Sequence, residues 1–189
     1  TSLQGIHTDS GLEIDGILEI PNGIAPRFVD TFHNTGEIRL LGNGASTIFY
    51  VDNANTDGVR LSGGGKLSLS DSPSNVVAAW SGGETLTNVD NLIHGAGSLG
   101  NNSVNFVNQS GGRIEADAAN VLMLDPAATL INAGALRAIA GGTLRLQPAT
   151  FDGSAETSVI EALAGSTVEL NAATIVGGRH WREAAMTFA

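Results

Sequence analysis

The second half of the chain alternates apolar residues with other residues in short segments that recur along the sequence. Three series of these segments share one spacing of 21 to 24 residues. The series are Ile114–Ala116, Leu136–Ala138 and Ile160–Ala162; Leu122–Leu124, Leu144–Leu146 and Val168–Leu170; and the pairs that begin at Thr129, Thr150 and Thr174. Alternation with period two is typical of strands, so each repeat predicts three short strands.

Small and turn-forming residues separate the segments, as at Asn132–Gly134, Gly141–Gly142 and Ala164–Ser166. No helical pattern intervenes, which argues against alternating strands and helices. Three strands per repeat predict a parallel β-helix, a solenoid whose repeats contact only their neighbours. We expect it to be right-handed, as strand crossovers generally are. With 22–24 residues per turn, the 189 residues predict an all-β solenoid of about eight turns.

The first half of the chain follows the pattern more loosely. Residues 34–40 resemble residues 132–138, and residues 64–69 resemble residues 141–146. Residues 71–83, which include Pro73 and Trp80, predict a longer loop. We therefore expect the β-helix to span residues 1–178, with residues 1–30 forming an irregular start or an N-terminal cap.

Residues 179–189 break the pattern and are basic where the rest of the chain is acidic. Trp181 and Phe188 recur at a spacing compatible with one face of a helix. A solenoid end exposes unpaired backbone groups that must be covered. The segment is interpreted as a C-terminal tail or cap, and a cap, a disordered tail and a partner-binding helix all remain open.

Stacking the repeats predicts ladders of side chains. Glu115, Arg137 and Glu161 would form one outward column of alternating charge. Opposite charges on neighbouring strands stabilise a sheet by a few tenths to about 1 kcal/mol, so a structural role is favoured over a catalytic one. Asn108 and Asn132 share the spacing of the repeats and predict an amide ladder in a bend.

Composition limits the classes of function. The chain has 19 acidic and 9 basic residues, a net charge of −10, and no apolar run long enough to cross a membrane as a helix. An acidic surface repels phosphate, so nucleic acid is not an expected partner. With no cysteine, the chain has neither a disulfide framework nor a thiolate site. The 25 glycines suit a chain of many tight bends.

Two phrases of the repeat, Asn-x-Gly-x-Ile/Leu-x-Ala and Gly-Gly-x-Leu-x-Leu, resemble those of secreted bacterial β-helix repeat proteins. Autotransporter passengers and filamentous-haemagglutinin-like adhesins are similar, and pectate-lyase-like enzymes share the architecture. The resemblance covers roughly residues 30–178. It implies a secreted or bacterial cell-surface location, and it carries no catalytic residue over to this chain. The same architecture serves adhesion, scaffolding and polysaccharide cleavage.

A candidate ligand-binding groove is predicted near Tyr50, Asp52, Asp57 and Trp80, which combine carboxylates with aromatic rings. Residues 53–58 also partly resemble a calcium loop, in which Asn53, Asn55 and Asp57 are the candidate ligands. The first ligand is neutral, and glycine occupies position 64, where a bidentate glutamate would stand. Any calcium site would therefore be weak, and an ordinary Asp-Gly turn is the favoured interpretation. No other cofactor is predicted.

Other chemistry leaves few local signals. The four histidines lack metal-binding spacing, and no serine stands in a Gly-x-Ser-x-Gly elbow. A folded solenoid can bring distant residues together, so a zinc site or a Ser-His-Asp triad stays open. Residues 95–100 match Gly-x-Gly-x-x-Gly without a following helix, and a bend is favoured over a dinucleotide site.

The leading hypothesis is a non-catalytic segment of a secreted or cell-surface protein that serves as an adhesin stalk or scaffold. A surface glycan or a protein is the expected partner, and end-to-end self-association is a further expectation. The alternative is a carbohydrate-active enzyme, either a polysaccharide lyase or a glycoside hydrolase. Against it, the single lysine and the acids that alternate with arginine give no visible pair of catalytic carboxylates. A calcium-stabilised structural module is the third hypothesis.

Overall fold

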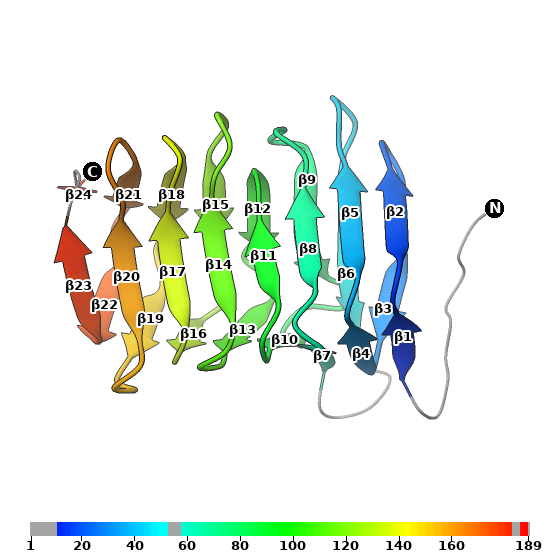
Figure 1. Ribbon diagram of the computed structural model, residues 1–189, viewed down its shortest axis with the longest axis horizontal. Coiled ribbons are helices and arrows are strands. Elements are labelled where there is room, and N and C mark those ends of the chain that lie inside the picture. Colours follow the sequence, from blue (N-terminus) through cyan, green and yellow to red (C-terminus); the bar gives the residue numbers. More distant parts are fainter. Residues whose placement is uncertain (1–10, 53–57, 183–185, 189) are drawn as a thin grey trace.

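The computed structural model describes residues 11–52, 58–182 and 186–188, and within them it contains 24 strands and no helix. The strands form three parallel sheets, named A, B and C here, and the chain visits the sheets in turn (Figure 1). One circuit through A, B and C is called a coil. This arrangement confirms the predicted parallel β-helix.

Each sheet contains eight of the described strands, in the order of the coils. Sheet A consists of β1 (Leu12–Ile14), β4 (Thr31–Asn34), β7 (Val59–Ser62), β10 (Thr85–Asn88), β13 (Asn105–Asn108), β16 (Thr129–Asn132), β19 (Thr150–Gly153) and β22 (Thr174–Gly177). Sheet B consists of β2 (Ile17–Pro21), β5 (Glu37–Leu41), β8 (Lys66–Leu69), β11 (Leu92–His94), β14 (Arg113–Ala116), β17 (Ala135–Ala138), β20 (Val159–Ala162) and β23 (Arg179–Arg182). Sheet C consists of β3 (Arg27–Val29), β6 (Thr47–Asp52), β9 (Asn75–Ala79), β12 (Gly97–Gly100), β15 (Leu122–Leu124), β18 (Thr143–Leu146), β21 (Thr167–Leu170) and β24 (Met186–Phe188).

The coil is right-handed and advances through seven steps between the first and last described strands of each sheet. In Figure 1 the strands of sheet B run upward on the near side while the chain advances from the N-terminus at the right to the left. The prediction of about eight turns is close to this. No helix of the described residues is long and apolar enough to cross a membrane.

The predicted register of the second half is confirmed. Ala138 pairs with Ala116 on one side and with Ala162 on the other, as the recurring spacing of the sequence predicts. Leu146 likewise pairs with Leu124 and Leu170. Along β18 and β21 the buried and outward positions alternate, and the buried apolar residues belong to one continuous core inside the coil.

The first half differs from the predicted pattern in three places. The longer loop predicted over residues 71–83 is wrong, because Asn75–Ala79 forms β9. Residues 1–30 are not irregular throughout, because β1, β2 and β3 lie within them and make the first coil. The predicted bend at residues 95–100 is wrong for Gly97–Gly100, which form β12. A Cβ atom at Gly97 would lie 2.3 Å from the carbonyl oxygen of Asn75, so only glycine lets the two coils approach here.

The tail also continues the solenoid. Arg179–Arg182 forms β23, which pairs in parallel with β20, and Met186–Phe188 forms β24, which pairs with β21. The helical face suggested by Trp181 and Phe188 is therefore not formed within these strands. The change of composition at residue 179 does not end the coil.

A buried amide ladder joins the coils at the corner between sheets A and B. Nδ2 of Asn108 donates to Oδ1 of Asn132 at 2.8 Å, as predicted from their spacing. The ladder extends in both directions, because Nδ2 of Asn88 donates to Asn108 at 3.0 Å and Nδ2 of Asn132 donates to Oγ of Ser158 at 2.9 Å. These side chains are at most 1% exposed, so each amide depends on its neighbours for hydrogen bonds.

Glycine follows the ladder at the same corner. A Cβ atom at Gly134 would lie 2.2 Å from the carbonyl oxygen of Gly112, and one at Gly112 would lie 2.3 Å from Oδ1 of Asn108. At Gly112 and Gly134 the coils are therefore stacked too closely for a side chain. Asn-x-Gly recurs in the sequence because the amide makes the hydrogen bonds and the glycine leaves room for them.

Two neighbouring residues of β18 test the assignment of inner and outer faces. Leu146 is fully buried, so Leu146→Ala should lower the free energy of unfolding by about 2–5 kcal/mol. Arg145 lies on the outer face with its side chain 38% exposed, so Arg145→Ala should cost less than about 1 kcal/mol. Urea denaturation of both variants measures the difference, and equal costs would contradict the assignment.

Candidate functional site

Sheet C carries the aromatic and acidic residues that the sequence singles out. Tyr50 and Asp52 lie on β6, and Trp80 follows directly after β9. The backbone N–H of Trp80 donates to the carbonyl oxygen of Val51 at 2.8 Å, which continues the pairing of β6 with β9 beyond the end of β9. Residues that are far apart in the sequence therefore lie on adjacent coils.

A fourth residue, Arg27 of β3, joins this group from the first coil. Its Nε donates to Oδ2 of Asp52 at 2.9 Å, and its Nη2 contacts the same oxygen. Its guanidinium also lies over the indole ring of Trp80, 4.4 Å from the ring centroid. The ring of Tyr50 meets the ring of Trp80 edge-on, with centroids 5.2 Å apart. We call Arg27, Tyr50, Asp52 and Trp80 the sheet C patch.

Exposure divides the sheet C patch into an inner and an outer part. The side chain of Asp52 is 9% exposed, whereas that of Arg27 is 45% exposed and Trp80 is 48% exposed. The carboxylate of Asp52 is thus covered and paired with a cation, and its main effect is to hold the guanidinium against the indole. The patch presents a planar cation and an aromatic ring to the solvent rather than a free acid.

The remaining predicted residues of the site lie outside the described residues. Asp57 belongs to the predicted groove, and Asn53, Asn55 and Asp57 are the predicted calcium ligands; none of the three is described. Within the described residues no group of three or more His, Asp or Glu side chains could hold a metal ion. The calcium hypothesis therefore stays a prediction.

Sequence reasoning missed Arg27, although a signal for it exists. Arg27 pairs with Tyr50, and the spacing between the two lies within the range of the repeats. Because an irregular start was predicted for residues 1–30, the strand β3 that contains Arg27 was not predicted. Glu84 was missed as well. It is 3% exposed, its Oε1 accepts a hydrogen bond from the backbone N–H of Ser81 at 2.6 Å, and its Oε2 has no hydrogen-bond partner among the described residues.

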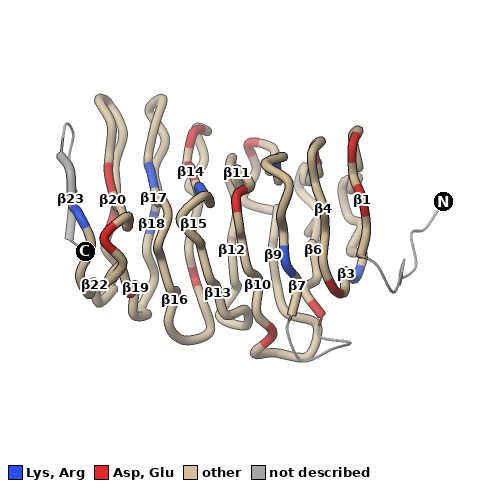
Figure 2. Tube along the Cα trace, turned by 60° about the horizontal axis from the view of Figure 1, so that its bottom comes forward, with Lys and Arg blue, Asp and Glu red and all other residues tan. Residues whose placement is uncertain are grey.

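The outer faces of sheets B and C carry ion pairs between neighbouring coils. Nε of Arg137 lies 2.5 Å from Oε1 of Glu161, and Nη1 of Arg137 lies 3.5 Å from Oε1 of Glu115. Nε of Arg145 donates to Oε2 of Glu169 at 2.5 Å. Basic positions on β17 therefore lie beside acidic positions on β20 (Figure 2). The columns of alternating charge form as the sequence predicts, with acid next to arginine.

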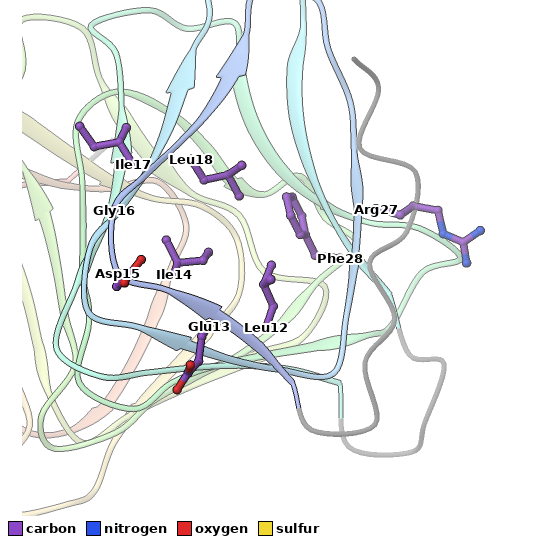
Figure 3. A pocket seen from close by; sticks show the side chains of 9 residues that line it. All are labelled: Leu12, Glu13, Ile14, Asp15, Gly16, Ile17, Leu18, Arg27 and Phe28. Atoms are coloured by element: carbon purple, nitrogen blue, oxygen red, sulfur yellow. The ribbon is translucent and has the colours of Figure 1, made fainter.

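A cavity of about 260 Å³ opens at the N-terminal end of the described coils. Leu12, Ile14, Leu18 and Phe28 point into it, and Glu13 points away (Figure 3). The same apolar positions continue as the core of the following coils. The cavity is thus the open end of the core in the described part of the chain, and the predicted end-to-end association stays a prediction.

No family model matches the chain, and comparisons with curated proteins and with solved structures give no match. The choice among functions therefore depends on the geometry of the chain's own residues.

A double-mutant cycle tests the contact that organises the sheet C patch. Arg27→Met keeps much of the apolar stem but removes the charge, and Trp80→Leu removes the ring. The two changes should be coupled by about 0.5–1 kcal/mol, the usual strength of a partly exposed cation–π contact. Arg27→Met leaves Asp52 unpaired whether or not Trp80 is also changed, so this cost cancels in the coupling energy. A coupling energy of zero in thermal or urea unfolding would contradict the stacking.

Proposed function

We propose that the chain is a non-catalytic segment of a secreted or cell-surface β-helix protein and serves as an adhesin stalk or scaffold. One observation carries the proposal: several acids on the outer faces pair with arginines of the same or a neighbouring coil. This holds for Asp52, Glu37, Glu115, Glu161 and Glu169. All of these pairs except that of Glu37 with Arg39 fasten one coil to the next, which is what a rod that carries load or spaces other modules requires.

The sheet C patch is the surface best suited to a partner. Trp80 gives an exposed ring, and Arg27 gives an exposed cation held in place by Asp52. Aromatic and arginine side chains dominate the energetics of binding surfaces. A surface glycan or a protein that docks here would gain affinity from the fixed geometry of these side chains, because little side-chain freedom is left to lose.

The alternative is a carbohydrate-active enzyme with its groove at Tyr50, Asp52, Asp57 and Trp80. The grouping of Tyr50, Asp52 and Trp80 on one face favours it. The pairing of Asp52 with Arg27 opposes it, because a glycosidase needs an acid with a raised pKa beside an ionised base or nucleophile. A lyase needs a strong base together with a cation that neutralises the uronate of its substrate.

Turnover and binding on the same polysaccharides separate the two hypotheses. The chain should release no reducing ends and no unsaturated uronate from pectin, other uronate polymers or neutral polysaccharides, with or without calcium. Any glycan that it binds should be bound more weakly by Trp80→Ala. Ile131→Ala, which removes an equally exposed apolar side chain from sheet A, should leave binding unchanged.

Turnover that is abolished by Asp52→Asn or Asp57→Ala would replace the stalk with the enzyme. Binding that is reduced equally by Trp80→Ala and Ile131→Ala would remove the sheet C patch as the binding surface.

A further inference from the structure

The outer face of sheet B carries a second constellation, separate from the sheet C patch. Ser68 of β8, His94 of β11 and Asp117, which directly follows β14, lie on three consecutive coils. Oγ of Ser68 is 2.8 Å from Nε2 of His94, and Nδ1 of His94 is 2.8 Å from Oδ2 of Asp117. The side chains of His94 and Asp117 are 24% and 29% exposed, so the row is accessible from solvent. This is the order of contacts of a serine nucleophile, its base and the base's orienting acid.

The contact with Asp117 fixes the tautomer of a neutral His94. An ionised carboxylate only accepts hydrogen bonds, so Nδ1 carries the hydrogen and donates it to Asp117. The lone pair of the imidazole then lies on Nε2, which faces Oγ of Ser68. An imidazole in this tautomer can take the proton of the serine hydroxyl.

A second acceptor lies beside Ser68. Oγ of Ser68 donates to Oε1 of Glu37 at 2.6 Å, and Nε of Arg39 donates to the other carboxylate oxygen of Glu37 at 2.8 Å. The hydrogen bonds from Arg39 and from Ser68 hold the pKa of Glu37 below its ordinary value. Glu37 is therefore a poor base. The hydroxyl of Ser68 has a single hydrogen, which Glu37 accepts in this arrangement, so the hydroxyl must turn toward Nε2 of His94 before the imidazole can take the proton.

Glu115, the other charged side chain next to His94, forms ion pairs with arginines. Glu115, the register partner of His94 on β14, pairs with Arg137 and more distantly with Arg113. Asp117 is the acid whose hydrogen bond to the imidazole the structure shows. Lys66, also on β8, is in register with Leu92, the first residue of β11, whereas His94 is the last residue of that strand.

We propose that Ser68 is a base-activated nucleophile that accepts an acyl group from an activated ester, with His94 as the base and Asp117 as the positioning residue. Oγ of Ser68 forms a bond to the acyl carbon while its proton moves to Nε2 of His94. The bond from the acyl carbon to the leaving oxygen then breaks, and the leaving alcohol takes that proton. Water repeats the sequence on the acyl-serine, releases the carboxylic acid and returns the proton to Oγ.

The surroundings of Ser68 also limit the rate. Ser68 lies within β8, which pairs with β5 on one side and with β11 on the other, so this stretch of backbone is engaged in sheet pairing. The acceleration expected is that of general-base assistance alone, about 10²–10⁴-fold. The natural reaction of Ser68 would therefore be a slow acylation, or acylation by a reactive donor, rather than fast turnover.

A fluorophosphonate probe tests the nucleophile directly, because it bonds covalently to base-activated serines. Intact-mass spectrometry of the full chain should show one adduct, and peptide mapping should place it on Ser68. Ser68→Ala should abolish the adduct. Ser154→Ala should not, because Ser154 has a carboxylate partner, Asp152, but no imidazole contact in the described structure.

Variants of the neighbouring groups identify the base. His94→Gln should slow labelling about 100-fold, which is the low end of general-base assistance. Glu37→Gln removes the charged competitor for the hydroxyl hydrogen and should speed labelling about tenfold. Asp117→Asn should slow labelling, and Asp117→Glu should restore part of it. In ¹⁵N spectra of neutral His94, Asp117→Asn should convert the Nδ1–H form into a mixture of tautomers, which a purely structural role of Asp117 would not do.

Three results would overturn the proposal: an adduct that does not map to Ser68, no adduct at all, or labelling of His94→Gln as fast as that of the unaltered chain. Circular dichroism and thermal midpoints establish that each variant is folded. If His94→Gln does not fold, Glu37→Gln provides the test. Labelling of Glu37→Gln that is no faster than that of the unaltered chain would refute the competition between Glu37 and His94 for the hydroxyl hydrogen of Ser68. The outcome does not depend on glycan binding at the sheet C patch.

Discussion

The structure depends on the hydrogen bonds that join each coil to the next in register. A strand at any level is stable only if the strands above and below present their backbone groups at the matching height, about 4.8 Å away. The corner between sheets A and B shows this requirement clearly, because the chain turns there with polar groups inside. Asn108 and Asn132 meet it with their amides, and Gly134 meets it by leaving room for the neighbouring carbonyl. A buried amide that lost its partner would cost about 1–3 kcal/mol, so the register cannot slip without a penalty at each coil that contributes to the ladder.

The same constraint produces the chemistry of the outer faces. Residues that are one coil apart in sequence become neighbours in space, so each outward column contains residues of successive coils rather than consecutive residues of the chain. On sheets B and C this brings acids beside arginines, as with Arg137 and Glu161, and the contacts strengthen the stack. On sheet C it brings Arg27 onto Trp80, and on sheet B it aligns Ser68 with His94. One periodic scaffold thereby supports both a structural role and local groupings of reactive side chains.

The sequence predicts the second half of the fold well because its coils there are nearly equal in length. One spacing repeats in three series, and the structure pairs the same residues. In the first half the coil length varies more: Leu18 pairs with Ile38, and Ile38 in turn pairs with Leu67, which is much further along the chain. A fixed period cannot find strands whose connecting bends change length. The strand Asn75–Ala79 therefore falls outside the pattern that predicts the other strands.

The sites follow the same rule. Tyr50, Asp52 and Trp80 could be chosen from residue type, but Arg27 could be found only from the register of β3, which the irregular-looking start conceals. Ser68, His94 and Asp117 lie on different coils and belong to no local motif, so sequence reasoning leaves a triad open without naming its members. Their alignment depends on the lengths of the bends between the strands, which residue types alone do not determine.

Engineered disulfides measure the register most directly, because the chain has no cysteine of its own. Thr150 and Thr174 are register partners on β19 and β22, at the separation that a disulfide can bridge. The variant Thr150→Cys/Thr174→Cys should oxidise to an intramolecular disulfide in the folded state. The variant Thr150→Cys/Val176→Cys, in which the second cysteine is displaced along the strand on the same face, should not. Cross-linking of the second pair in preference to the first would contradict the coil register on which the fold, the sheet C patch and the row of Ser68, His94 and Asp117 all depend.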